Sequence, residues 1–243
     1  MGTTPNELVM RLRALADPCI RRGYVARHLA EAEVEPLAML LGYLVLNAGH
    51  EDVRAAWLDV ALALLPAEGP VTIGTAAIVV ERLQAHPARG VLGFLAIDPG
   101  ERRGPDVIGD AYELEDVALG LRKAKARLRH RDLLRQMTAD PDPSVIRILL
   151  ENPMVGESEA IRVASLRPQS AATFLEVLSS VRFGVREAVQ AAIALNPWCP
   201  VRVGLAVLPM LSIAHLQQVA EATTLDPRVC EAARVLPAIR RRG

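Results

Sequence analysis

The residues whose types and spacing suggest chemistry are basic, and they lie in segment 122–135, here called the basic segment. Its cations are Arg122, Lys123, Lys125, Arg127, Arg129, Arg131 and Arg135, opposed within the segment only by Asp132. At about 100° per residue of a helix, Arg122, Lys125 and Arg129 share one face, and Lys123 and Arg127 share another. Such an array can bind phosphates or the carboxylates of an acidic partner.

A purely structural role is an alternative for these cations. A run of acidic residues precedes them: Asp106, Asp110, Glu113, Glu115 and Asp116. The basic side chains can pair with this run or solvate an exposed helix face. Aromatic residues, which would favour single-stranded nucleic acid, are not interleaved with the cations. Structural pairing, an acidic protein partner and nucleic acid therefore stay open as interpretations.

The remaining residues that could do chemistry are dispersed. None of the histidines is spaced for a shared metal with another histidine or a cysteine: His28, His50, His86, His130 and His215. His50 and His86 lie where helices are expected to start or stop, which favours capping. No phosphate-binding loop, nucleophile elbow or paired-carboxylate motif is present. We therefore expect neither an enzyme nor a bound metal or cofactor, and an enzyme whose site is assembled from residues distant in sequence is a further hypothesis.

The elements that must position the basic segment are short helices with clear ends. Asp142 can cap a helix that has Pro143 at its first position, and the pair Asn152-Pro153 ends that helix. Its apolar residues, which include Val145, Ile148 and Leu149, are spaced to face a core. A second short helix is expected from residue 157 until residue 167, which precedes another proline.

The same pattern recurs along the chain. Residues 184–197 again form an apolar stretch that ends in Asn-Pro, and residues 198–209 form a short stretch that ends in proline. The two Asn-Pro pairs are about 44 residues apart, in the range of helical solenoid repeats. More divergent copies occupy residues 225–237 and 50–66. We expect Asn152 and Asn196 to form a structural ladder by binding backbone groups of the preceding turn.

The order of aspartate-proline, valine-arginine, an apolar helix and asparagine-proline is similar to that of HEAT-like and leucine-rich-repeat-variant α-solenoids. Segment 119–168 also resembles a block in bacterial helical-repeat proteins. The resemblance implies an all-α, right-handed solenoid with an irregular helical N-terminal part, which presents a surface to partners. Leucine-rich-repeat-variant proteins are associated with a cysteine cluster that holds an iron–sulfur centre. Cys19, Cys199 and Cys230 are too scattered to match it, so the cofactor is not implied here.

One HEAT-like group excises damaged DNA bases through a basic concave surface that carries aromatic residues and a carboxylate. In this chain Trp57 and Asp59 are the nearest match. Trp57 lies on the apolar stripe of its expected helix with Val53 and Val60, which predicts core packing and not base stacking.

The composition agrees with a helical protein. The 243 residues are 51% hydrophobic and only 3% aromatic, which suits packed helices better than a β-sandwich. With 28 basic and 28 acidic residues the net charge is zero, so binding to nucleic acid or membranes has to be local. The dispersed cysteines and the amphipathic N-terminal stretch predict a cytoplasmic protein. The longest apolar run, residues 37–46, is too short to cross a membrane.

We expect an N-terminal helical subdomain over 1–97, a loop or hinge over 98–112 and a HEAT-like repeat subdomain over 113–243. Helices are predicted from Pro5 and over 20–32, 36–47, 51–65, 72–84, 88–96, 213–222 and 228–240. The predicted function is that of an adaptor or scaffold that binds an acidic protein partner. Its predicted site is the basic segment with the repeat arginines Arg147, Arg162 and Arg186. Nucleic acid through the same residues is the alternative, and a homodimer through the apolar helices of 37–65 is a further hypothesis.

Overall fold

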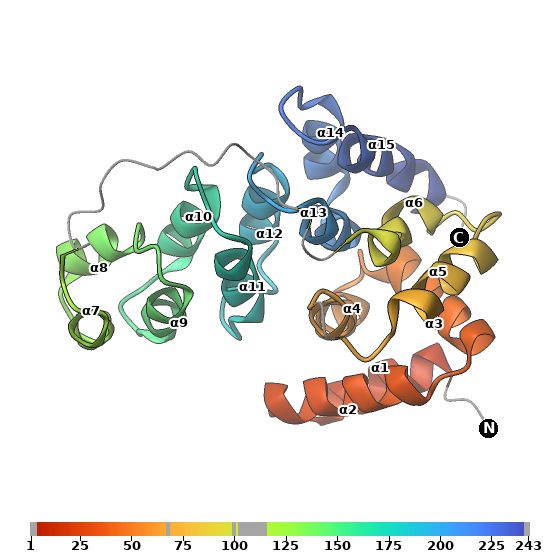
Figure 1. Ribbon diagram of the computed structural model, residues 1–243, viewed down its shortest axis with the longest axis horizontal. Coiled ribbons are helices and arrows are strands. Elements are labelled where there is room, and N and C mark those ends of the chain that lie inside the picture. The colour runs from red at the N-terminus through yellow and green to blue at the C-terminus, as the bar shows by residue number, and fades with distance from the viewer. Residues whose placement is uncertain (1–3, 67–68, 99–100, 102–115, 241–243) are drawn as a thin grey trace. The chain divides into compact units, whose positions relative to one another are not determined.

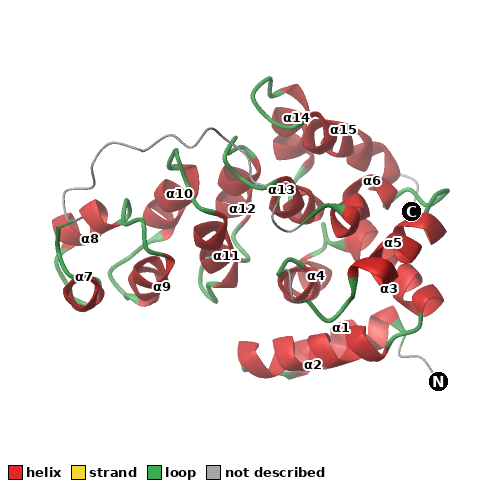
Figure 2. Cartoon of the chain, viewed as in Figure 1, coloured by secondary structure: helices red, strands yellow, loops and turns green. Residues whose placement is uncertain are grey.

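A computed structural model describes residues 4–66, 69–98, 101 and 116–240 (Figure 1). Within these residues the secondary structure consists of helices without strands (Figure 2), which confirms the prediction of an all-α chain. The chain divides into two compact units. The terminal unit combines Met1–Glu101 with Val201–Gly243, and the central unit is Arg102–Pro200. Apart from residues 98 and 101, the expected loop 98–112 lies outside the described residues.

The two units divide the chain differently from the expected subdomains 1–97 and 113–243. The helices after residue 200 belong to the terminal unit, although the repeat pattern in the sequence continues into them. Long-range hydrogen bonds explain this. Trp57 donates its indole N–H to the carbonyl oxygen of Ala206 at 2.8 Å. Arg202 donates to the carbonyl oxygens of Leu64 and Ile97 at 2.7 and 2.6 Å.

The terminal unit is built around two apolar helices, α3 and α4. Its elements are α1 Pro5–Ala14, α2 Pro18–Glu31, α3 Val34–Asn47, α4 Glu51–Leu64, α5 Ile73–Arg82, α6 Arg89–Leu92, η1 Gly93–Ala96, α13 Val201–Val207, η2 Leu208–Met210, α14 Ile213–Glu221 and α15 Pro227–Arg240. Helix α3 packs against α1, α4, α5 and α6, and α4 packs against α1 and α2. Leu37, Leu41 and Leu44 are fully buried. The apolar stretch considered as a homodimer face therefore packs the core of its own unit.

Trp57 lies in this core, as predicted. Its side chain has 0% exposure and meets the ring of Phe94 edge-on, with ring centroids 6.4 Å apart. The Arg202 guanidinium lies over the same Phe94 ring, 5.8 Å from its centroid. These contacts anchor α13 against α4 and η1, and they leave Trp57 unavailable for stacking on a base.

Aspartate-proline pairs begin three of the helices. The residue before the first proline is Asp17 in α2, Asp142 in α9 and Asp226 in α15. Each of these carboxylates accepts from the backbone N–H two residues ahead, at 2.7, 2.8 and 2.8 Å respectively. The predicted helix start at Pro143 is confirmed. Helix α2 begins at Pro18, two residues before the predicted start, because Asp17 caps the following helix.

The central unit consists of short helices. They are α7 Leu119–Lys125, α8 Arg131–Met137, α9 Pro143–Glu151, α10 Glu157–Ser165, α11 Ala171–Ser179 and α12 Glu187–Ala194. Helix α9 packs against α7, α8 and α11, while α10 packs against α11 and α12. Val145, Leu149, Phe174 and Val177 are fully buried between these helices. Helices next but one along the chain therefore pack together, α7 with α9, α9 with α11 and α10 with α12.

Two asparagines connect these helices as the sequence predicts. The Asn152 side-chain amide donates to the carbonyl oxygens of Ala126 and Leu128 at 2.8 and 3.0 Å. Asn196 donates in the same way to the carbonyl oxygens of Ala164 and Leu166 at 2.9 and 2.8 Å. Each asparagine thus satisfies the carbonyls at the C-terminal end of an earlier helix, where a helix leaves such groups without intrahelical partners.

Candidate protein-binding surface

The basic segment forms two helices and a turn. Helix α7 ends at Lys125 and α8 begins at Arg131. The Asn152 side-chain amide donates to the carbonyl oxygens that follow α7. The His130 ring nitrogen Nδ1 accepts from the backbone N–H of Leu133 at 3.2 Å and so caps α8. Arg129 therefore lies in the turn. The expectation that it shares one helical face with Arg122 and Lys125 is wrong.

Arg122 is directed into the central unit. Its Nη1 lies 2.7 Å from Asp140 Oδ1, and the two side chains are 12% and 0% exposed. The same Asp140 oxygen accepts from the backbone N–H of Asp142 at 2.9 Å. This ion pair joins α7 to the loop before α9. Arg122 is thus occupied by a contact within the fold and presents little of its charge to a partner.

Three other predicted arginines also have intramolecular partners. Arg127 donates to the carbonyl oxygen of Lys123 at 2.9 Å, and Arg162 donates to the Thr138 hydroxyl at 3.0 Å. Arg147 forms an exposed ion pair with Glu176, whose hydrogen bonds raise the pKa of the Arg147 guanidinium.

The remaining predicted cations differ in their surroundings. Lys123 and Lys125 are half-buried in the last turn of α7, where positive charge complements the helix dipole. The other four are exposed and form no ion pair with any residue that the structure describes: Arg129, Arg131, Arg135 and Arg186. Of the acidic run expected to neutralise the segment, Asp116 is described and the rest lies outside the described residues.

Two carboxylates close to the basic segment are held ionised by hydrogen bonds. The Ser144 hydroxyl donates to Asp142 and lowers its pKa, with a smaller contribution from the charge of Lys123. The backbone N–H of Gly156 donates to Glu159 at 2.9 Å and lowers the pKa of that carboxyl. Both carboxylates lie at helix N-termini and serve as caps.

Exposed leucines accompany the cations, and sequence reasoning missed them. Leu119, Leu121 and Leu128 are 39%, 54% and 52% exposed, and no residue of α7 is buried. Leu121 and Leu128 are seven residues apart, a spacing that in a continuous helix indicates one inward stripe. Because α7 ends between them, that inward stripe does not form, and both side chains face solvent.

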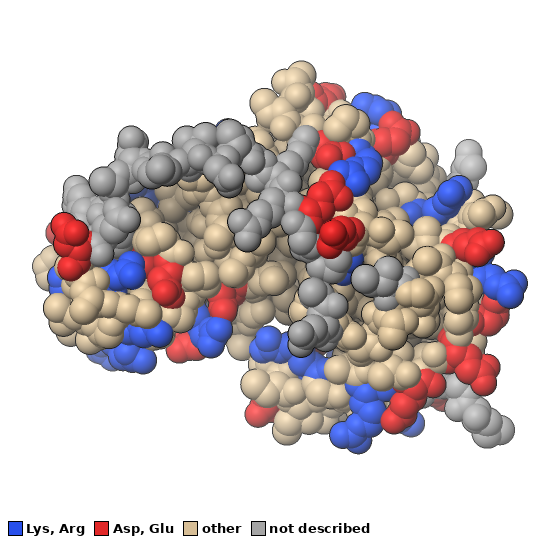
Figure 3. All heavy atoms as spheres, viewed as in Figure 1, with Lys and Arg blue, Asp and Glu red and all other residues tan. Residues whose placement is uncertain are grey.

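A hollow of about 580 Å³ lies beside these residues. It is lined by Lys125, His130, Asp132, Leu133 and Gln136. We call the surface of α7, its following turn and the start of α8 the α7–α8 surface. Its exposed members include Leu119, Leu121, Leu128, Arg129 and Arg131, together with Arg127, His130 and the acidic Asp132. Figure 3 shows basic and acidic side chains over the part of the view that α7 and α9 occupy in Figure 1. The arrangement offers guanidinium groups for carboxylates or phosphates, together with apolar contacts.

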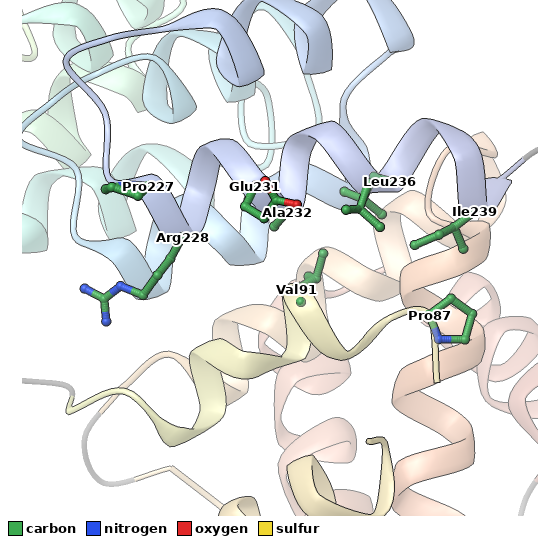
Figure 4. A pocket seen from close by; sticks show the side chains of 10 residues that line it. Pro87, Val91, Pro227, Arg228, Glu231, Ala232, Leu236 and Ile239 are labelled. Carbon is green, nitrogen blue, oxygen red and sulfur yellow. The ribbon is translucent and has the colours of Figure 1, made fainter. Parts of the chain in front are cut away.

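The terminal unit carries a second concavity, a groove of about 550 Å³ between α6 and α15 (Figure 4). Its walls are mainly apolar and include Val91, Leu236 and Ile239. The ionic groups at its edge have partners within the unit. Arg228 is hydrogen-bonded to Asp226 and Glu101, which raises the pKa of its guanidinium, and Glu231 pairs with Arg234. The groove therefore presents apolar surface and neutralised charges.

Among residues 4–66, 69–98, 101 and 116–240, no group of three or more histidine, cysteine, aspartate or glutamate side chains is placed to hold a metal ion. In that same part of the chain, no helix combines the length and the apolarity that crossing a bilayer requires.

Comparison with known proteins leaves the chain without a family assignment. No protein-family model matches it, and neither a curated protein nor a solved structure does so.

Proposed function

We propose that the protein is a non-enzymatic interaction module, an adaptor or scaffold, and that the α7–α8 surface binds an acidic region of a protein partner. The observation that carries this proposal is the exposure of Arg129 and Arg131 without an ion pair to any described residue. Their neighbour Arg122 instead forms an ion pair with Asp140. The charge of Arg131 contributes to the lowered pKa of Glu159, but a guanidinium whose N–H groups are not hydrogen-bonded within the fold is available for paired hydrogen bonds to a carboxylate.

A HEAT-like repeat architecture of the leucine-rich-repeat-variant kind, as in bacterial helical-repeat proteins, is part of the proposal. Support comes from the packing of helices next but one along the central unit and from the equivalent bonds of Asn152 and Asn196. Repeats of this kind present long surfaces whose side chains can change without loss of the core. A binding role therefore fits the architecture.

We also propose a cytoplasmic location. Cys19, Cys199 and Cys230 form no disulfide bond in the described part of the chain, and Cys199 and Cys230 are buried. Cysteines outside disulfides are usual in a reducing compartment, where disulfides rarely persist.

Nucleic acid is the competing ligand, because the same cations can bind phosphates. The exposed leucines favour a protein, since an apolar aliphatic side chain gains little beside a phosphate backbone. No phenylalanine, tyrosine or tryptophan occurs between residues 116 and 137 to stack on bases. We therefore propose a protein as the ligand, and the experiment below distinguishes it from nucleic acid.

The test is affinity purification from an extract of cells that make the protein, with the purified chain as bait. We expect a discrete protein to be retained after nuclease treatment and to be released by high salt, because exposed ion pairs are screened. The double variant Arg129→Glu/Arg131→Glu should lose that protein. Arg131 is the first residue of α8, where a carboxylate is compatible with the helix dipole, so the variant should still fold.

The matched control is Arg27→Glu/Arg89→Glu, which changes the net charge equally at two exposed arginines of the terminal unit. This control should retain the partner. Equal loss from both double variants would show that net charge alone drives capture, and material that disappears with nuclease would show a nucleic-acid ligand. Either result would overturn the proposal.

A further inference from the structure

We infer that the acidic segment bound by the α7–α8 surface is amphipathic, and that Leu121 and Leu128 receive its apolar side chains. This inference rests on the proposed function, because it concerns the chemistry of the same partner. The occupant is a protein segment in which carboxylates and leucine-sized side chains share one face.

Exposed apolar side chains are concentrated on the α7–α8 surface. Scattered exposed leucines are normal on a protein surface. Here three leucines within ten residues are at least 39% exposed: Leu119 and Leu121 on α7, which buries no residue, and Leu128 in the turn that follows. A helix of the central unit normally directs apolar residues inward, as α9 does with Val145 and Leu149, which are fully buried. Exposed apolar side chains gathered in one short segment are a feature of interaction sites.

Positive charges lie beside the exposed leucines. Leu128 lies in the turn between Arg127 and Arg129, and all three side chains are exposed. Lys125 and His130 line the adjacent hollow, which also holds one carboxylate, Asp132. A ligand with only negative charge would leave the leucines in water, and a purely apolar ligand would leave the guanidinium groups without a counter-charge. A segment with both kinds of side chain satisfies both parts of the surface.

The ionic contacts and the apolar contacts of this complex should differ in their dependence on salt concentration. Contacts between exposed charges weaken as the Debye length shrinks, whereas burial of apolar area changes little with moderate salt. Burying the exposed halves of two leucines is expected to tighten binding about tenfold. Affinity for an amphipathic acidic segment should therefore persist at a salt concentration that abolishes affinity for a purely acidic one.

The experiment uses the full chain and three fluorescent helical peptides of about twenty residues. One carries glutamates and leucines on a shared face, one carries glutamates and alanines, and one carries lysines and leucines. Fluorescence anisotropy is measured at about 50 mM and about 300 mM salt, with an oligothymidine as a fourth probe. We expect the glutamate-leucine peptide to bind about tenfold more tightly than the glutamate-alanine peptide, and the lysine-leucine peptide not to bind.

Variants assign the effect to residues. Leu121→Ser/Leu128→Ser should abolish the preference for leucine while it keeps the affinity for the glutamate-alanine peptide. Val181→Ser is the control, because Val181 is 67% exposed in the same unit and lies outside the α7–α8 surface. Arg129→Glu/Arg131→Glu should weaken binding of both acidic peptides.

The outcomes separate the two proposals. Equal binding of both acidic peptides, or a leucine preference that survives Leu121→Ser/Leu128→Ser, overturns this inference and leaves the proposed function standing. If neither acidic peptide binds, or if the oligothymidine binds more tightly than both, the inference and the proposed function fall together.

Discussion

Asn152 and Asn196 make the same three hydrogen bonds at successive positions of the central unit. Besides the two carbonyls that each amide group satisfies, each side-chain oxygen accepts from the backbone N–H two residues ahead at 3.0 Å. Both asparagines are nearly buried, with exposures of 4% and 2%. The equivalence explains why Asn-Pro recurs in the sequence. The asparagine closes an earlier helix, and the proline prevents its own helix from continuing.

Replacement of Asn196 by alanine should destabilise the central unit. The change leaves the carbonyls of Ala164 and Leu166 without their donor in a part-buried site. We expect the free energy of unfolding to fall by about 2–3 kcal/mol. Urea denaturation followed by circular dichroism measures this. Asn196→Asp should cost at least as much at neutral pH, because a carboxylate then faces two carbonyl oxygens.

The aspartate variant supplies its own control. At a pH below about 3, its carboxyl is protonated and can donate one of the lost hydrogen bonds. The free energy of unfolding of Asn196→Asp should then rise relative to that of Asn196→Ala, compared with the difference between the two variants at neutral pH. If the two variants keep the same difference at both pH values, the amide does not act as the donor that the fold requires.

Local signals made much of this fold predictable. The Thr4 capping box, the Asp142-Pro143 helix start and the Asn152-Pro153 stop each act within a few residues, and the structure shows each of them. The asparagine ladder was predictable because the same residue recurs at a repeat spacing. The sequence therefore predicts most helix ends and the structural role of Asn152 and Asn196.

Long-range partners were not predictable in the same way. Trp57 and Ala206 are 149 residues apart, and no local pattern indicates that the Trp57 indole N–H and the Arg202 guanidinium join α13 to the terminal unit. Arg122 in a basic run resembles its exposed neighbours in sequence, yet the geometry of one helix end directs it onto Asp140. The candidate site was therefore predictable as a segment. Which of its cations face solvent depends on where α7 ends.

Arg122 should behave as a structural residue in mutational tests. Arg122→Met leaves Asp140 as an unpaired charge with 0% exposure, and we expect a loss of about 3–5 kcal/mol in unfolding free energy. Arg147→Met removes the Arg147–Glu176 pair, in which the Arg147 side chain is 60% exposed, so about 0–1 kcal/mol is expected. Thermal and urea unfolding of both variants would measure this contrast.

A second substitution tests the cause of the Arg122 effect. If an uncompensated buried carboxylate destabilises Arg122→Met, then Arg122→Met/Asp140→Asn should recover part of the loss, since the asparagine is neutral and can still accept from the Asp142 N–H. Equal instability of the single and double variants would attribute the loss to packing of the arginine stem instead.

Gly184 should not tolerate a side chain. A Cβ at this position would lie 2.0 Å from the carbonyl oxygen of Leu178 and 2.9 Å from that of Ser180. The Gly184 N–H donates to that Ser180 carbonyl at 2.8 Å, so the turn cannot open without loss of this bond. We expect Gly184→Ala to lower the free energy of unfolding by about 2–3 kcal/mol or more.

Gly120 provides the matched comparison for Gly184. No atom lies within 4 Å of a Cβ built there, and the residue is inside α7. Gly120→Ala should stabilise α7 by about 0.5–1 kcal/mol, because alanine loses less backbone entropy in a helix. Denaturant midpoints that move in opposite directions for the two variants would support this account, and a shared direction would contradict it.

Stability of the central unit should depend on pH through Asp142. Its pKa in the folded state is lowered, chiefly by the Ser144 hydroxyl, so the folded state favours the charged form. Its stabilising effect is therefore present above the ordinary aspartate pKa and is lost as the pH falls through the lower folded value. We expect Asp142→Ala to cost about 1 kcal/mol at pH 7, with a smaller cost at about pH 2.

Ser170→Ala separates this titration from the general loss of a helix cap. The Ser170 hydroxyl accepts from the backbone N–H of Thr173 at 3.1 Å and caps α11 without a titratable group. Its removal should cost a similar free energy at both pH values, because its protonation does not change. Urea unfolding of the wild type and both variants at pH 7 and at about pH 2 gives the comparison. A cost of Asp142→Ala that stays constant between these pH values would show that the carboxylate acts through shape and neutral hydrogen bonding alone.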